Sequence, residues 1–358
     1  MSKVVIVPEP HIFDKTFKTR VNYPQEINTY INQVFDLARQ QAESDKVYVI
    51  FMGDVFHMGF SRMVPFVNTI DTFQTISREF EGRVYSLIGN HELSYPANNP
   101  FWLLADFKSK WYKNYRNIPG FQSAACMKVC DELQVDDTLF VFGHYRRDKF
   151  EYDWDKYEDV HFLTHNSIMD NEIVNVIKNN FGRDPKMEYA SGITSIRQAG
   201  SIPLTPKLSH MYVGHMHTAY SRFFVDEKIN DVDLKFELRY LGSLGRTNHA
   251  EVNNEDLTRV IPIVDTVTHQ VSYPEIQLLP REVCIREDAV IKGQEQYQRT
   301  KVITKLRKDN VRFGSPVEGI RDWLSQSPAD LDIFNQLISN APLDELDNLL
   351  LLSADSTE

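Results

Sequence analysis

The chain has 358 residues, of which 42% are hydrophobic and 12% aromatic, and this composition is typical of a globular protein rather than a disordered or collagen-like one. It contains no apolar run long enough for a membrane span, and the apolar stretch before Pro8 is too short for the core of a signal peptide. The net charge of -11 excludes a general attraction for nucleic-acid phosphates, so a nucleic-acid role would depend on local basic patches or metal ions. The odd number of cysteines, 3, fits a reducing compartment, and we expect a cytoplasmic protein that does not contact membranes.

The first ninety residues alternate between short apolar runs and segments of helical periodicity. Residues 4–7, 46–52 and 83–88 are β-branched or apolar runs, which fit strands buried on both faces. Between them, apolar residues spaced three and four apart predict helices over 25–41 and 62–80. The order strand, helix, strand, helix, strand predicts an α/β fold.

The remainder of the chain is predicted to be rich in strands up to residue 265. The runs that predict these strands are 138–142, 161–164, 210–213, 222–225 and 234–241. From residue 266 the pattern changes to a charged stretch rich in proline, and two short amphipathic helices are expected over 329–339 and 343–352. We therefore predict a main domain over 1–265, a small α/β cap over 266–326 and a helical segment over 327–358.

Five polar motifs follow five of these apolar runs. They are Glu9-Pro10-His11, Gly53-Asp54-Val55-Phe56-His57, Gly89-Asn90-His91-Glu92, Thr164-His165-Asn166 and Gly214-His215-Met216-His217. Strand ends of one sheet can bring such side chains to a single edge, and mixed histidine, carboxylate and amide donors suit manganese, iron or zinc better than calcium. Each motif alone is a weak signal, because a lone histidine is more often structural. Five in this order favour a two-metal site, which hydrolyses phosphate esters through an activated water.

In order and spacing these motifs resemble the calcineurin-like metallophosphoesterases, whose pattern is D-x-H, G-D, G-N-H-[DE], H and G-H-x-H. The resemblance spans residues 4–245 and implies an α/β fold in which a two-sheet sandwich is flanked by helices, followed by a small α/β cap and C-terminal helices. Two features are similar to the DNA repair and recombination branch, the SbcD-type nuclease subunits and their phage counterparts. One is His57, three residues after Asp54, and the other is Tyr240-Leu241-Gly242-Ser243. A phage-encoded protein would work in the host cytoplasm.

The resemblance also implies a role for each motif residue. The first divalent ion would be bound by Glu9, His11, Asp54 and His217, and the second by Asp54, Asn90, His165 and His215. Both ions are expected to be Mn²⁺, with Asp54 between them because a carboxylate has two oxygens. His91 would stabilise the transition state and protonate the leaving oxygen, His57 would position the phosphate, and Glu92 would orient His91.

One motif residue departs from the family pattern, because Glu9 occupies the place of the first aspartate. Its extra methylene moves the carboxylate by about a bond length, whereas metal–ligand distances tolerate only roughly 0.2 Å. We therefore expect a weaker first site. The alternatives are a backbone already shifted to suit glutamate, or catalysis that runs mainly on the second ion.

Two basic segments are candidate DNA contacts. In the first, Lys108, Lys110, Lys113 and Arg116 interleave with Trp111, Tyr112 and Tyr115; the second contains Arg299, Lys301, Lys305, Arg307 and Lys308. Backbone contacts and base stacking would use such segments, although the first could equally be a helix with a solvated basic face. His144-Tyr145-Arg146-Arg147 also follows a strand, and either lines the rim of the site or lies simply on the surface.

The sequence also indicates partners. The helix over 62–80 carries apolar residues on both faces, with Val64 and Val67 opposite the core stripe, and a two-fold partner covers such a face in this family, which predicts a homodimer. The C-terminal helices either pack on the main domain or, as the resemblance implies, dock on the coiled coil of an SbcC-type ATPase.

Together these observations predict a metal-dependent DNA nuclease that hydrolyses phosphodiester bonds by a two-metal mechanism, as the nuclease subunit of a recombination or repair complex. Exonuclease and endonuclease activity both remain open. One alternative is a phosphodiesterase or phosphatase acting on other substrates. Another is a catalytically weakened scaffold subunit, which the Glu9 substitution and the acidic charge suggest.

Overall fold

A computed structural model describes residues 1–94, 99–109, 124–169, 173–175, 178–179, 194–198, 200–217, 222–245 and 258–286. The chain divides into two compact units, Met1–Ile285 and Arg286–Glu358, and the elements given below belong to the first. The expected C-terminal helices and most of the expected cap lie outside the described residues.

A seven-stranded sheet forms one layer of the first unit. Its order is β14-β13-β1-β2-β3-β5-β4. The five strands from β1 to β4 in this order run parallel to one another. The strands are β1 (Ser2–Val7), β2 (Lys46–Phe51), β3 (Val84–Ser86), β4 (Ala105–Phe107), β5 (Met127–Val129), β13 (Ile263–Asp265) and β14 (Gln270–Ser272). The first three confirm the strands predicted from apolar runs.

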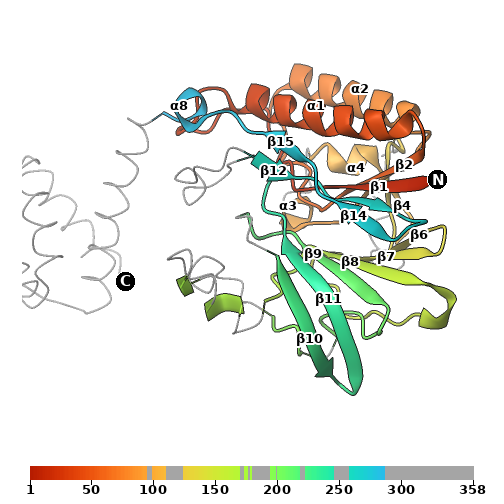
Figure 1. The fold of residues 1–358 in the computed structure, drawn as a ribbon. Coiled ribbons are helices and arrows are strands. Elements are labelled where there is room, and N and C mark those ends of the chain that lie inside the picture. The colour runs from red at the N-terminus through yellow and green to blue at the C-terminus, as the bar shows by residue number, and fades with distance from the viewer. Residues whose placement is uncertain are drawn as a thin grey trace, which may run out of the picture. The chain divides into compact units, whose positions relative to one another are not determined.

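Helices α1 (Tyr23–Ala42) and α2 (Met63–Glu79) cover the outer face of this sheet (Figure 1). Helix α1 begins where the Asn22 side chain accepts a hydrogen bond from the Gln25 amide, which satisfies one of the free donors at a helix start. It buries Ile27, Ile31 and Val34, as the helical spacing predicted. Two short helices, α3 (Asn90–Ser94) and α4 (Phe101–Leu104), follow β3.

A six-stranded sheet of order β10-β11-β9-β8-β7-β6 forms the second layer (Figure 1). Its strands are β6 (Glu132–Val135), β7 (Thr138–Gly143), β8 (Asp159–Thr164), β9 (Leu208–Val213), β10 (Phe223–Ile229) and β11 (Val232–Tyr240). Val4 and Ile6 of the first sheet pack against Phe140, Phe142 and Leu163 of the second in one buried cluster. The predicted two-sheet α/β sandwich flanked by helices is therefore confirmed.

The first unit continues past residue 265, the domain boundary that the sequence pattern predicts, and ends at Ile285. Strand β14 pairs with β13, and β15 (Glu275–Gln277) pairs with β12 (Thr258–Val260) before α8 (Arg281–Cys284) ends the unit. Ile276 and Leu278 are buried in the core beneath α1. Each of these strands has only three residues, which is too short for a periodic pattern to be recognised in the sequence. Across the described ranges, no helix combines the length and the apolar character that crossing a membrane requires.

Candidate metal centre

The loops after β1 and β2 pair with each other and so bring three motif residues together. The His11 amide donates to the Asp54 carbonyl at 3.0 Å, and the His57 amide donates to the Ile12 carbonyl at 2.9 Å. His11 and Asp54 have φ angles of 50° and 45°, in the left-handed region that residues other than glycine seldom adopt. Such strain persists where the surrounding structure enforces it, often at functional sites.

A first cluster of donor atoms comes from Glu9, His11, Asp54 and His217, whose ligand atoms all lie within 4.8 Å of one another. Glu9 Oε2 is 3.4 Å from His11 Nε2 and 3.7 Å from His217 Nε2, and Asp54 Oδ2 is 3.8 Å from His11 Nε2. The structure thus brings together the four residues that the resemblance assigned to the first ion.

A second cluster shares Asp54 with the first. Donor atoms of Asp54, His165 and His215 lie within 4.8 Å of one another, and Asp54 Oδ2 is 3.2 Å from His165 Nε2. Asn90 Oδ1, from the start of α3, lies 3.1 Å from His165 Nε2 and 2.8 Å from His215 Nδ1. All four residues assigned to the second ion therefore converge, with Asp54 placed between the clusters.

The buried polar atoms of these clusters fit a pair of cations. Within the described part of the chain, both ring nitrogens of His11 are buried without a hydrogen-bond partner, an arrangement that is costly unless something else binds them. Burial and the nearby His217 lower the pKa of His11, and burial lowers that of His215 to about 3, so both rings are neutral as metal ligands must be. Burial also acts to lower the pKa of His165, but the charges of Asp54 and Glu9 outweigh it and raise that pKa to about 10. A divalent cation at the same carboxylates would replace that proton.

Glu9 is accommodated through the glycine that precedes His215. Glu9 Oε1 accepts a hydrogen bond from the His215 amide, and a side chain at Gly214 would collide with that oxygen. The other oxygen, Oε2, faces His11 and His217. The Glu9 carbonyl also accepts the Leu244 amide at 2.8 Å, which ties it to the end of the Tyr240–Ser243 motif. The space at Gly214 and the His215 amide therefore accommodate the longer side chain of glutamate, as expected if the local backbone suits glutamate.

Glu92 supports the site differently from what we expected. We predicted that it would orient His91, but Glu92 Oε2 instead accepts the backbone amides of Asp54 at 2.9 Å and Gly89 at 2.8 Å. These bonds hold the β2 loop beside α3, where a side chain at Gly89 would collide with Asp54. Burial and the charge of Asp54 raise the pKa of Glu92 to about 8, so Glu92 adds little negative charge to the cluster at neutral pH.

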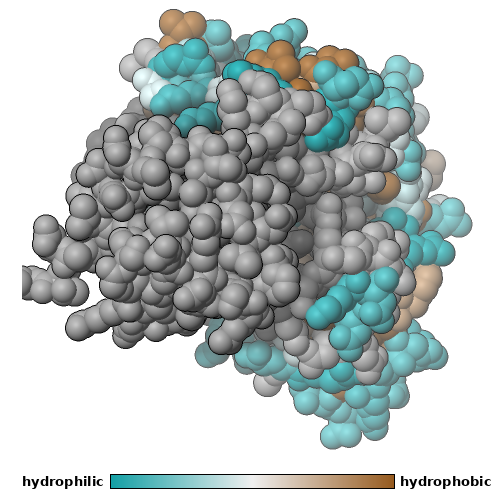
Figure 2. Space-filling model, turned by 90° about the vertical axis from the view of Figure 1, so that its left-hand side faces the viewer, coloured by the Kyte–Doolittle hydropathy of each residue, from teal (hydrophilic) through white to brown (hydrophobic). Residues whose placement is uncertain are grey.

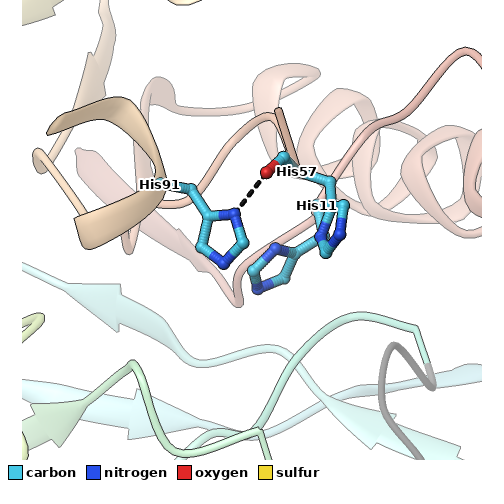
Figure 3. Close-up of side chains that lie close together, drawn as sticks. All are labelled: His11, His57 and His91. Carbon is cyan, nitrogen blue, oxygen red and sulfur yellow. Dashed lines mark hydrogen bonds between the residues drawn. The ribbon is translucent and has the colours of Figure 1, made fainter. Parts of the chain in front are cut away.

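His57 and His91 lie beside the first cluster (Figure 3). Their ring centroids are 4.8 Å apart, and the His91 ring is 4.9 Å from that of His11. His91 Nδ1 contacts the His57 carbonyl, and His91 Nε2 is 3.9 Å from Asp54 Oδ2. Phe17 packs edge-on against the His57 ring at 4.9 Å. Burial lowers the pKa of His57 to about 4, so its ring is neutral at physiological pH.

The candidate DNA contacts are only partly described. Lys108 follows β4, is exposed and pairs with Asp106 at 3.1 Å. The other candidates, Lys110, Lys113, Arg116, Arg299, Lys301, Lys305, Arg307 and Lys308, lie outside the described residues.

The His144–Arg147 loop lies at the rim of the site, which was one of its two interpretations. The Tyr145 ring is 5.6 Å from the His215 ring and 6.3 Å from the His165 ring. Asn166 belongs to one of the five motifs, but the sequence did not predict that its side chain holds this loop. The only sequence signal was its position directly after His165.

Comparison with known proteins agrees with this geometry. The model of the calcineurin-like phosphoesterase family matches residues 9–219, while no curated protein matches the chain. A solved structure described as "Structural and Functional Characterization of a Novel Archaeal Phosphodiesterase" is 13% identical and covers 76% of this chain and 99% of its own, with a TM-score of 0.29 that carries no inference. Because the family match runs through every motif from Glu9 to His217, the chain belongs to the calcineurin-like phosphoesterases, a family of metal-dependent phosphoester hydrolases.

Proposed function

We propose that the protein is a metal-dependent DNA nuclease that hydrolyses phosphodiester bonds. The observation that carries the hydrolytic part is the pair of donor clusters joined by Asp54, with His57 and His91 beside them. The expected cofactors are two Mn²⁺ ions, which when bound supply positive charge to the phosphoester and lower the pKa of water.

The chain's own residues divide the remaining work. Asp54 would bind both ions and Asn90 the second, and the neutral ring of His57 is placed to contact a phosphate oxygen. His91 has a side chain 17% exposed, at the mouth of the site, and would donate a proton to the leaving oxygen. In hydrolysis of a polynucleotide the leaving group is a sugar alkoxide, which a proton donor such as His91 would neutralise.

The proposed substrate is DNA because of the G-D-V-F-H and Tyr240–Ser243 motifs. The structure supports a role for both at the site: the first supplies His57, and in the second the Ser243 amide donates to the carbonyl of His217 at 3.0 Å. Both motifs similar to the recombination branch therefore lie at the donor clusters.

An assay on several substrates tests this proposal. We expect Mn²⁺-dependent cleavage of end-labelled duplex or single-stranded DNA and of bis(p-nitrophenyl) phosphate, with much slower hydrolysis of p-nitrophenyl phosphate. Chelation should stop cleavage and Mn²⁺ should restore it, and the Asp54→Asn variant is the control for a contaminating nuclease. Hydrolysis of the small diester without any cleavage of DNA would contradict a nuclease and favour a phosphodiesterase.

The proposed setting is a recombination or repair complex in the cytoplasm, with a homodimer and an SbcC-type ATPase as partners. Val64 and Val67 on α2 are 70% and 46% exposed, which supports a partner surface on this helix. Figure 2 shows brown apolar surface at the top of the molecule, over the helical layer. The segment 327–358, proposed to bind the ATPase, lies outside the described residues.

A further inference from the structure

The turn that follows β7 is anchored to two of the loops that carry metal-ligand candidates. The Arg147 amide donates to the His144 carbonyl at 2.9 Å, which closes the turn. The Tyr145 amide donates to the Ile88 carbonyl at 2.9 Å, just before the Gly89-Asn90 motif. On the other side, Asn166 accepts the Arg146 amide at 2.7 Å and donates to the carbonyls of His144 and Arg147 at 3.3 and 3.2 Å. The turn therefore has a defined position relative to Asn90 and His165.

The two adjacent arginines of this turn have different surroundings. Arg147 is buried, and its guanidinium donates to the Asp131 and Phe142 carbonyls at 2.9 and 2.6 Å and to the Tyr152 hydroxyl at 2.7 Å. Arg146 is exposed, and in the described part of the chain no carboxylate pairs with it. Arg147 is thus structural, whereas the charge of Arg146 is available to a ligand.

Arg146 is presented by a strained backbone and an aromatic ring. Its φ angle is 68°, a left-handed conformation that the Asn166 hydrogen bonds enforce. Its guanidinium carbon lies 5.3 Å from the centre of the Tyr145 ring, a cation–π distance, and the same ring lies 5.6 Å from His215. Tyr145 therefore contacts both a metal-ligand candidate and an exposed cation. A planar guanidinium held on a ring is well suited to bind a phosphate through two hydrogen bonds.

We propose that Arg146 binds a second phosphate of the substrate, next to the phosphodiester held at the donor clusters. Tyr145 contacts the His165 and His215 rings, whereas the guanidinium of Arg146 contacts Tyr145, so Arg146 would reach a neighbouring phosphate rather than the one that reacts. The proposal rests on the proposed function and deepens it, because a polynucleotide carries a second phosphate next to the reacting diester, which a small diester such as bis(p-nitrophenyl) phosphate lacks. Arg146 would therefore favour polynucleotides over diesters with a single phosphate.

The experiment compares Arg146→Gln with Lys235→Gln, which removes the same charge from an exposed side chain on β11. Both are assayed with Mn²⁺ on an end-labelled single-stranded oligonucleotide and on bis(p-nitrophenyl) phosphate over a series of salt concentrations. For Arg146→Gln we expect KM for the oligonucleotide to rise about tenfold with kcat nearly unchanged. The decrease in kcat/KM should be about tenfold larger for the oligonucleotide than for the small diester.

The salt dependence of kcat/KM distinguishes phosphate binding from a purely structural role, because a structural residue would not change it. Loss of one phosphate contact should reduce the slope of log kcat/KM against log salt by about 0.7 for a single strand. Arg146→Lys keeps the charge but loses the planar stack, so it should keep the slope and show an intermediate KM. The Lys235→Gln variant should match the wild type in both.

The outcomes separate this proposal from the nuclease proposal. If the wild type cleaves DNA and Arg146→Gln keeps its KM and salt slope, the role of Arg146 is overturned and the nuclease stands. Equal losses on both substrates would also overturn it, because Arg146 would then act on the donor clusters themselves. If the wild type hydrolyses the small diester but does not cleave DNA, both proposals fail.

Discussion

Strands β8 and β9 each carry one histidine in the middle and one just past the end, and the two pairs differ sharply. Within the strands, His161 lies opposite His210, with rings 4.8 Å apart and only 5° from parallel. Past the strand ends, the rings of His165 and His215 are 5.4 Å apart and tilted by 55°. Only the second pair belongs to a donor cluster among the described residues.

The difference comes from the backbone rather than from the residue type. Inside a sheet, side chains stand side by side along the pleat, so the ring of His161 stacks on its neighbour and its Nε2 pairs with Asp159 at 2.8 Å. At the strand end the chain turns, with φ of 63° at His215, and both rings lie near the shared carboxylate of Asp54. In the described part of this protein, the histidines just past the strand ends belong to a donor cluster, and those within the strands do not.

The largest effect should come from removing the carboxylate that both donor clusters share. Asp54→Asn should reduce hydrolysis by roughly 10³-fold or more, because a neutral amide attracts cations weakly. It should also abolish the rise in Tm that Mn²⁺ gives the wild type, a rise that follows from binding to the folded state. Thermal unfolding with and without Mn²⁺, beside a diester assay, measures both.

The matched control is Asp159→Asn in the mid-strand pair. It removes the partner of His161 and should lower Tm, yet leave the Mn²⁺-induced rise in place. If both variants lost the rise equally, the distinction between mid-strand and strand-end histidines would fail.

The next effect concerns His91, which lies beside the first cluster without being assigned to an ion. His91→Ala should lower kcat by about 10²- to 10⁴-fold, as loss of a general acid does. Its metal content, measured by elemental analysis after dialysis against Mn²⁺, should equal that of the wild type. Loss of metal would instead make His91 a ligand, which its position near His11 and His57 would allow.

A smaller effect is expected at Glu9. Glu9→Gln should raise the Mn²⁺ concentration for half-maximal activity by roughly tenfold or more, because the first cluster loses one charge. Glu9→Asp should not tighten this site, since the Gly214 gap and the His215 amide already suit glutamate. Calorimetric titration that shows two unchanged ions in the Gln variant would make Glu9 a bystander.

The smallest effect is a pH dependence of stability from the mid-strand pair. Burial and the charge of His161 lower the pKa of His210 to about 4, from 6.5 when exposed. Between these values the unfolded chain binds a proton that the folded chain does not, so stability falls as the pH drops through this window. His210→Gln should reduce the loss of Tm between pH 7 and 4.5 by a few degrees. If the wild type and His210→Gln lost the same amount of Tm, the pH dependence would come from other buried groups.

Much of the architecture and of the candidate site could be predicted from the sequence. Continuous apolar runs such as 46–52 are local signals of a buried strand, and the motifs that follow them occur in a fixed order along the chain. That order and the family resemblance already grouped Asp54, His165 and His215 into one expected site. The expected single sheet edge was wrong, because Asp54 follows a strand of the first sheet and the two histidines follow strands of the second.

Only the tertiary structure decided contacts made between segments far apart in sequence. Glu92 holds the amides of Asp54 and Gly89, and Gly214 makes room for Glu9, although neither relation leaves a periodic trace. The same is true of β15, which is a strand only because β12 lies beside it. Arg146 and Arg147 are identical as residues, and their different surroundings come from a turn held by Asn166. Local pattern determines which elements form, whereas burial and partner atoms depend on the packed chain.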